Sequence, residues 1–307
     1  MGFGKVDLER LSKIITNHRS AMLESNVIGS DFSFGNFGGR TLIFKIEPMV
    51  YYPFLTSIEN AMLSLIFPMN DFLTSGREPK IAMIDIEKPA DAGDDYWNYV
   101  DFLLLELEHR NIKVASGHTG NYENTISGVA GSLALVGFQR PIFSYKRMTK
   151  EDAFYVVGRI GAEMEFFLER MKPGKRAFDL EDLSIEKYVR LFSSYKKDIH
   201  YVHDLSEGGL IRGLEEISIL NRRGFDVNYS ATRPLIVDER PGRRAIKLSS
   251  SSSGSIVVSV DREYKKEFED IATANSWQFA EIRCKGRDVT VNGRRVSSHD
   301  EFSRLIG

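Results

Sequence analysis

Segments with strand-like and helix-like periodicity alternate along the first half of this chain. The strand-like segments are residues 41–47, 80–87, 112–116 and 125–137, and the helix-like segments are residues 6–25, 57–76 and 94–111. In the strand-like segments apolar residues recur every second position or run together, whereas in the helix-like segments they recur three or four positions apart. This alternation predicts a mixed α+β fold, in which helices cover a mixed sheet.

The second half of the chain repeats this mixture with different spacing. The expected strands are residues 153–158, 199–204, 255–260 and 279–283, and the expected helices are residues 160–171, 184–197 and 262–275, with one more after residue 208. Asn292-Gly293 between two short apolar runs predicts a type I′ hairpin. A proline and a basic run at residues 141–150 separate the two halves, so we expect an N-terminal domain over residues 1–148 and a C-terminal domain over residues 149–307.

Charge and cysteine usage restrict the partners of this chain. The formal net charge is -2, and basic residues are interleaved with acidic ones, which argues against nucleic acid and membrane as partners. The single cysteine, Cys284, excludes an internal disulfide. The apolar runs are shorter than the roughly 20 residues that a membrane-spanning helix needs, and we find no signal-peptide pattern. A cytoplasmic protein is therefore expected.

Polar residues at strand and helix ends in the first half are candidate ligand groups. Asp31 follows Gly29 and Ser30, where a carboxylate can hold Mg²⁺ on a phosphate or close an Asx turn. Lys45 and Glu47 lie on one face of a strand, as ligand groups or as a surface ion pair. Each position therefore has a structural alternative to the functional one.

Two further groups of polar residues extend this set. Asn70 and Asp71 interrupt an apolar helix and require a partner, either a metal ion or a buried hydrogen bond. Gly117, His118 and Thr119 form an expected loop, "SGHTG", whose small residues let a ligand approach the backbone. A structural turn is the alternative for this loop.

The stretch "HDLSEGGL" brings several polar groups to the start of a helix. These groups are His203, Asp204, Ser206 and Glu207, followed by Gly208 and Gly209. Glycine costs a helix about 1 kcal/mol relative to alanine, so two glycines suggest a close approach to the backbone. A helix N-terminus with free N–H groups suits phosphate, whereas the alternative is that Ser206 merely caps the helix. We find no G-x-x-x-x-G-K-[ST] loop and no G-x-G-x-x-G after a strand.

The order of these motifs resembles the AIR synthase-like superfamily of ATP-dependent proteins. The resemblance rests on "GSD", "ND" followed by "SG", "SGHTG", "HDLSEGGL" and "SSSSSGSIVVSV", which occur in the order that the family shows. This superfamily includes aminoimidazole ribonucleotide synthase, HypE, selenophosphate synthetase and thiamine monophosphate kinase. The resemblance implies an N-terminal α/β domain that forms a homodimer through its strands, and a C-terminal α+β domain that closes over the ligand.

The same resemblance implies ATP and Mg²⁺ as cofactors and assigns roles to the candidate residues. The metal ligands would be Asp31, Glu47 and Asp71. The ATP and phosphate groups would be Lys45, Asn70, Gly117, His118, Thr119, Ser206, Gly208 and Gly209. The catalytic candidates would be His203, Asp204 and Glu207. A basic loop with Arg240, Arg243 and Arg244 is a further candidate for an anionic substrate, or a solvated turn.

The chain departs from the family pattern at the metal ligands. Ser30-Asp31 stands where many members have two aspartates, and Glu47, with Lys45 two residues before it, stands where they have an aspartate. The leading hypothesis is an enzyme that uses ATP and Mg²⁺ to phosphorylate a small-molecule or protein-tethered acceptor. The rival hypothesis is a nucleotide- or partner-binding protein that keeps the fold with little or no turnover.

Overall fold

The computed structural model describes residues 14–15, 17–122, 128–172, 174, 176–237 and 248–298. It is a mixed α+β structure with two sheets, as the alternating periodicity predicts. The first half contains η1 (Arg19–Ala21), β1 (Ser33–Phe37), β2 (Arg40–Pro48), α2 (Ser57–Leu73), β3 (Ile81–Lys88), α3 (Asp95–His109), β4 (Lys113–Asn121), β5 (Gly131–Gly137) and η2 (Tyr145–Arg147).

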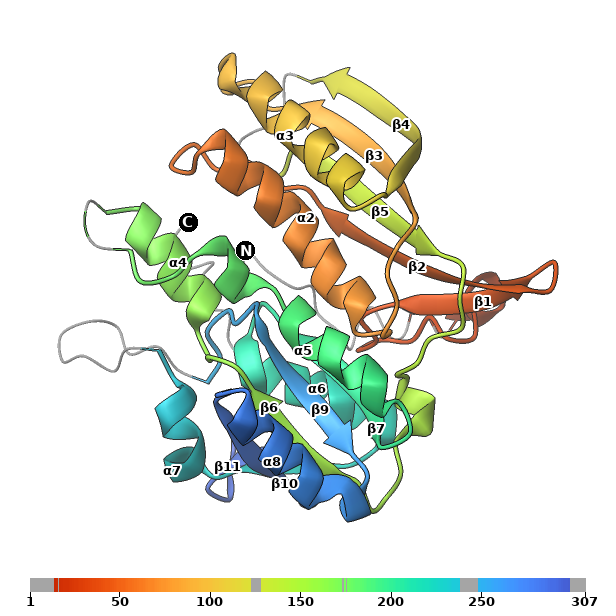
Figure 1. The fold of residues 1–307 in the computed structure, drawn as a ribbon, viewed down its shortest axis with the longest axis vertical. Helices are drawn as coiled ribbons and strands as arrows, with labels where there is room; N and C mark the ends of the chain where they lie inside the picture. Colours follow the sequence, from red (N-terminus) through yellow and green to blue (C-terminus); the bar gives the residue numbers. More distant parts are fainter. Residues whose placement is uncertain are drawn as a thin grey trace.

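The first sheet has the strand order β1-β2-β5-β3-β4. Its neighbours are antiparallel except β3 and β4, which are parallel. Helices α2 and α3 lie side by side on one face of this sheet (Figure 1). Ile43 of β2 and Leu135 of β5 point to that face and are buried, whereas Ile46 and Met83 lie on the opposite face and are exposed.

The second half holds the other sheet. Its elements are β6 (Ala153–Val157), α4 (Ala162–Arg170), η3 (Leu180–Leu183), α5 (Glu186–Phe192), η4 (Ser193–Tyr195), β7 (Ile199–Leu205), α6 (Gly209–Asn221), β8 (Phe225–Val227), α7 (Tyr229–Thr232), η5 (Arg233–Leu235), β9 (Ser255–Val260), η6 (Arg262–Tyr264), α8 (Lys265–Ala274), β10 (Phe279–Cys284), β11 (Val289–Val291) and β12 (Arg294–Arg295). The strand order is β12-β11-β8-β10-β6-β9-β7. Every residue of β7 and of β9 is buried.

Helix α2 connects the two halves. It begins at a capping box, in which the Thr56 hydroxyl accepts the N–H of Glu59 and the Glu59 carboxylate accepts the N–H of Thr56. Leu65 and Phe72 pack in a buried cluster with residues of both sheets, and Leu63 and Ile66 pack in a second cluster with residues of the second sheet. Because both sides of α2 are buried, its position fixes how Asp71, near its C-terminal end, faces the second half.

Several expected elements differ from the structure. The "SGHTG" segment, expected as a loop, is part of β4, and β1 forms in the glycine-rich stretch over residues 29–39, where no strand was expected. Pro68 lies inside α2, and the helix continues past it to Leu73. The expected helix over residues 6–25 lies largely outside the described residues. The Asn292-Gly293 hairpin is confirmed, with φ values of 49° and 76°. Among the helices of the described residues, none is long and apolar enough to cross a membrane.

Candidate functional site

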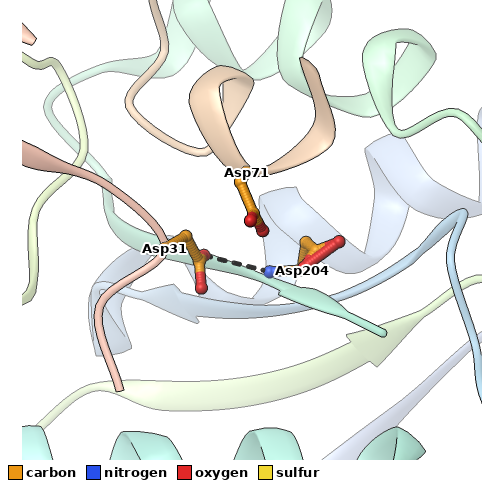
Figure 2. A group of neighbouring side chains, drawn as sticks. All are labelled: Asp31, Asp71 and Asp204. Atoms are coloured by element: carbon orange, nitrogen blue, oxygen red, sulfur yellow. Dashed lines mark hydrogen bonds between the residues drawn. The ribbon is translucent and has the colours of Figure 1, made fainter. Parts of the chain in front are cut away.

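Three aspartates from three separate parts of the chain meet at one point (Figure 2). Asp31 precedes β1, Asp71 lies near the C-terminal end of α2, and Asp204 is the penultimate residue of β7. Each offers a carboxylate oxygen, and these oxygens lie within 4.8 Å of one another. The backbone N–H of Asp204 also donates to Oδ2 of Asp31 at 3.2 Å. Residues from both halves therefore build one acidic cluster, which we call the aspartate cluster.

A glycine places Asp31 against the second half. Gly29 has a φ of +88°, and a Cβ atom built there would lie 2.7 Å from the carbonyl oxygen of Glu216 in α6. A side chain at this position would therefore clash with the helix backbone, in addition to the cost of the left-handed conformation. The loop can approach α6 closely because residue 29 is glycine, and Asp31 follows two residues later.

Lys45 binds two carboxylates beside the aspartate cluster. Its Nζ atom lies 2.6 Å from Oε1 of Glu47 and is in direct contact with Oδ2 of Asp71. Side chains two residues apart on a strand share one face, so Lys45 and Glu47 of β2 both lie on the face that α2 covers. Both therefore reach the end of that helix. Glu47 was expected to be a metal ligand beside Asp31 and Asp71, and in this structure it is paired with Lys45.

Burial and neighbouring charges shift the pKa values of Asp71, Glu47 and Lys45. Burial raises the pKa of Asp71 to about 7, with further contributions from Asp204 and Asp31, and the opposing attraction of Lys45 does not cancel them. Burial likewise raises the pKa of Glu47 to about 7 against the attraction of Lys45. Burial by itself would lower the pKa of Lys45, but Asp71 and Glu47 together raise it, so Lys45 stays an ammonium. A cation bound at the cluster would stabilise the ionised carboxylates.

His203 lies behind the aspartate cluster between two acidic groups. Its Nδ1 atom is 2.6 Å from Oδ1 of Asp31, and its Nε2 atom is 3.2 Å from Oε2 of Glu216. The side chain is 2% exposed. Burial disfavours the imidazolium, but Asp31 and Glu216 outweigh it and raise the pKa of His203 to about 10. Both ring nitrogens therefore contact carboxylates of the protein, and the catalytic role of His203 stays a prediction.

The helix start after Asp204 is packed closely rather than open. Ser206 and Glu207 are half-buried, whereas Gly208 and Gly209 are buried. The N–H of Gly209 donates to the carbonyl of Ser206, and the N–H of Ile211 donates to the carbonyl of Leu248. A Cβ atom at Gly209 would lie 2.3 Å from the carbonyl oxygen of Ser250. Gly209 was expected to present a free N–H group to phosphate, but this N–H is bonded within the turn, and the backbone of Leu248 and Ser250 packs against Gly209.

Asn70 points away from the aspartate cluster although Asp71 points toward it. Its side-chain NH₂ donates to the carbonyl of Leu183 at 2.8 Å, and its Oδ1 accepts the N–H of Ile185 at 3.1 Å. Successive helix residues are turned by about 100°, so neighbours in sequence face different partners. The partner that Asn70 requires is thus the backbone of the second half, which is the buried hydrogen bond of the two alternatives.

Gly117, His118 and Thr119 lie away from the aspartate cluster. They belong to the edge strand β4, which β3 and β5 separate from β2. Residues paired across a sheet point to the same face, and the pairs His118–Asp85, Asp85–Ser132 and Ser132–Pro48 run across the sheet. Pro48 is one residue from Glu47, so His118 lies on the face opposite Lys45 and Glu47. Its imidazole Nε2 lies 2.9 Å from the hydroxyl of Tyr122. The three strand spacings from β4 to β2 amount to about 14 Å.

Glu216 is a site residue that the sequence reasoning missed. It lies on the buried face of α6 and its side chain is 9% exposed. Arg212 holds its second oxygen, with Nε of Arg212 3.0 Å from Oε1 of Glu216. A glutamate among apolar positions of an amphipathic helix requires a polar partner, and that signal could have identified it. The basic loop with Arg240, Arg243 and Arg244 lies outside the described residues.

Comparisons with known proteins agree with this architecture. Residues 149–282 match the family model "AIR synthase related protein, C-terminal domain". Phosphoribosylformylglycinamidine synthase subunit PurL of Leuconostoc mesenteroides is 27% identical over 208 residues, which are 62% of this chain and 26% of that protein. PurL of Picrophilus torridus is 20% identical over 261 residues, 80% of this chain and 34% of that protein. The chain thus spans about a quarter to a third of the length of these relatives.

Solved structures resemble the fold over nearly the whole chain. A chain of a HypE-HypF complex superposes with a TM-score of 0.70 and 17% identity, covering 93% of this chain and 99% of that chain. AaThiL complexed with AMPPCP and TMP gives a TM-score of 0.70 and 17% identity, covering 97% and 99%. HypE in complex with ATP gives a TM-score of 0.65 and 17% identity, covering 96% and 91%. At these identities the likeness establishes the fold.

Proposed function

Because this chain is an AIR synthase-related protein with the two-sheet fold of that superfamily, we propose that it uses ATP and Mg²⁺ to phosphorylate an acceptor. The acceptor is a small molecule or a group tethered to a protein. Support comes from relatives that carry nucleotide, namely AaThiL with AMPPCP and HypE with ATP. The observation that carries the proposal is the meeting of Asp31, Asp71 and Asp204 within 4.8 Å.

The aspartate cluster fits Mg²⁺ by its donor set. Its three side chains offer carboxylate oxygens, which are the ligands that Mg²⁺ prefers, together with substrate phosphates and water. The raised pKa of Asp71 reflects burial beside like charges, a condition that a divalent cation relieves. Asp31, Asp71 and Asp204 would hold the metal, which would supply positive charge to offset the phosphate charge during phosphoryl transfer.

The remaining residues of the site act by positioning. His203 holds the Asp31 carboxylate, and the N–H of Asp204 fixes its second oxygen. Lys45 restricts Asp71 by direct contact. Phosphoryl transfer depends mainly on positioning and charge stabilisation, so rigid carboxylates are what this chemistry requires from the chain. Ser206 and Glu207, at the turn beside Asp204, remain the candidates for contacts with nucleotide or acceptor.

The open face of the first sheet supports the expected homodimer. Ile46 is 61% exposed and Met83 is 42% exposed, and the strand register places both in one row across that face. Asp85 on the same face has a buried Oδ1 atom without a hydrogen-bond partner among the described residues. We propose that a second copy covers this face. His118 lies at the edge of this face, so a contact of His118 with nucleotide would involve the partner subunit, whereas Thr119, the next residue of β4, points to the opposite face.

The test is ADP formation from ATP in the presence of Mg²⁺ with a panel of acceptors. Turnover by the wild type that falls at least 100-fold in Asp71→Asn supports the enzyme. Asp101→Asn, an exposed aspartate on α3, serves as the matched control and should keep full activity. The contact of Lys45 with Asp71 favours the second candidate, a nucleotide-binding protein with little or no turnover. Tight ATP binding without ADP formation would establish that alternative.

A further inference from the structure

Lys45 lies between two carboxylates of the first half. Its Nζ atom bridges Oδ2 of Asp71 and Oε1 of Glu47, carboxylates from α2 and β2. The Lys45 side chain is 15% exposed and that of Asp71 is 14% exposed, so this ion pair is largely shielded from water. A divalent metal ion can likewise bind two carboxylates at once.

We propose that the Lys45 ammonium replaces a second metal ion at this site, so that each chain binds a single divalent cation, at the aspartate cluster. This inference rests on the proposed function, because it assumes that the aspartate cluster binds Mg²⁺. It assigns Asp71 a double task, in which Oδ2 contacts Lys45 and Oδ1 faces the metal. Glu47 then serves Lys45 and leaves the set of metal ligands.

The geometry of β2 holds the Lys45 ammonium beside the Glu47 carboxylate. Lys45 and Glu47 are two residues apart on one strand, so their side chains leave the same face and meet without bending the backbone. A lysine ammonium is a compact charge with three donors, which suits two carboxylates at once. Mg²⁺ would need its ligand oxygens at about 2.0–2.1 Å, in the space that Nζ fills. A divalent cation and an ammonium would also repel each other between the same two carboxylates.

A different role for Lys45 would be direct contact with a nucleotide phosphate. The contacts in the structure favour the carboxylate role, since Nζ reaches both Asp71 and Glu47. The two roles predict different results when the charge of Lys45 is removed. Loss of a phosphate contact weakens nucleotide binding and leaves the metal count unchanged, whereas loss of a built-in cation raises the metal count.

The experiment counts Mn²⁺ bound per full-length chain by equilibrium dialysis with electron paramagnetic resonance detection. We expect one Mn²⁺ in the wild type, two in Lys45→Met, and one in the double variant Lys45→Met with Glu47→Gln, which lacks the second carboxylate. Lys80→Met is the control, because Lys80 is exposed and pairs with Glu78, and it should bind one Mn²⁺.

The outcomes separate this inference from the proposed function. One Mn²⁺ in both wild type and Lys45→Met, or two in the wild type, overturns the role of Lys45 and leaves the metal site standing. No Mn²⁺ in the wild type overturns the metal site itself, and this inference with it. Where Lys45→Met is unfolded without metal, Mn²⁺ should restore its native circular dichroism spectrum. Failure of Mn²⁺ to do so also contradicts the proposal.

Discussion

The imidazole Nδ1 of His203 lies 2.6 Å from Oδ1 of Asp31, and this ion pair joins β7 of the second half to the loop before β1 in the first. The pair is buried, and Glu216 holds the opposite ring nitrogen. Because its pKa is raised to about 10, His203 is charged over the whole physiological range and acts as a fixed link between the two halves.

His203 makes stability depend on pH. Its folded-state pKa, about 10, lies above the unfolded value near 6.5, so its contribution is fully present below pH 6.5 and is lost as the pH rises to about 10. His203→Gln should lower the free energy of unfolding by about 3–5 kcal/mol at pH 6, because two buried carboxylates lose their cation. Urea unfolding in metal-free buffer at pH 6, 8 and 10 should show this difference shrinking. A difference that does not change with pH would contradict the charged state.

Asn70 should matter for stability rather than for nucleotide binding. Asn70→Ala leaves the carbonyl of Leu183 and the N–H of Ile185 without their partner, at a cost of about 2–4 kcal/mol in the free energy of unfolding. Asn98→Ala, an exposed position on α3, is the control and should cost less than about 0.5 kcal/mol. Urea unfolding and nucleotide titration calorimetry measure the two effects. A folded Asn70→Ala that loses nucleotide affinity without losing stability would restore the predicted ATP role.

Gly209 should tolerate no side chain. Its φ is +54°, and a Cβ atom would lie 2.3 Å from the carbonyl oxygen of Ser250. Gly286→Ala is the matched control, since Gly286 has a φ of +69° with open space around it. We expect about 1 kcal/mol of destabilisation in Gly286→Ala from backbone strain, and at least about 3 kcal/mol in Gly209→Ala from strain and overlap. Equal thermal shifts in the two variants would show that the turn is more open than the structure has it.

The open face of the first sheet should mediate dimerisation. Ile46→Glu and Met83→Glu place charges in the middle of that face, and each should convert a dimer to a monomer in sedimentation velocity. Leu105→Glu alters a leucine of α3 that is 43% exposed, away from that face, and should leave the dimer intact. A monomeric wild type, or a dimer that survives both changes, would rule out this interface.

The fold could be predicted well wherever periodicity is strong. Helix α3 and strand β3 lie within two residues of their predicted bounds, because their apolar residues repeat without interruption. Strand β1 was missed because its glycine and asparagine resemble a loop, and pairing with β2 supplies what local preference lacks. The "SGHTG" segment was likewise mistaken for a loop, since the ladder with β3 stabilises it.

The sequence predicts which types of residue form the site, but not which of these residues contact one another. Asp31 and Asp71 stand out because each is a carboxylate in a glycine-rich or apolar setting. Their meeting with Asp204, however, depends on how α2 packs against β7. The sequence also did not predict which way each side chain points, since Asn70 points away from the aspartate cluster and its neighbour Asp71 points toward it. Only packing between the two halves determines which carboxylates come together.

The most direct measurement is a crystal structure with a non-hydrolysable ATP analogue and Mn²⁺, in which anomalous scattering locates the metal. We expect one Mn²⁺ bonded to carboxylate oxygens of Asp31, Asp71 and Asp204 and to the phosphates of the analogue. Nucleotide bound with its metal away from these three aspartates, or metal bound between Asp71 and Glu47 with Lys45 displaced, would contradict this account.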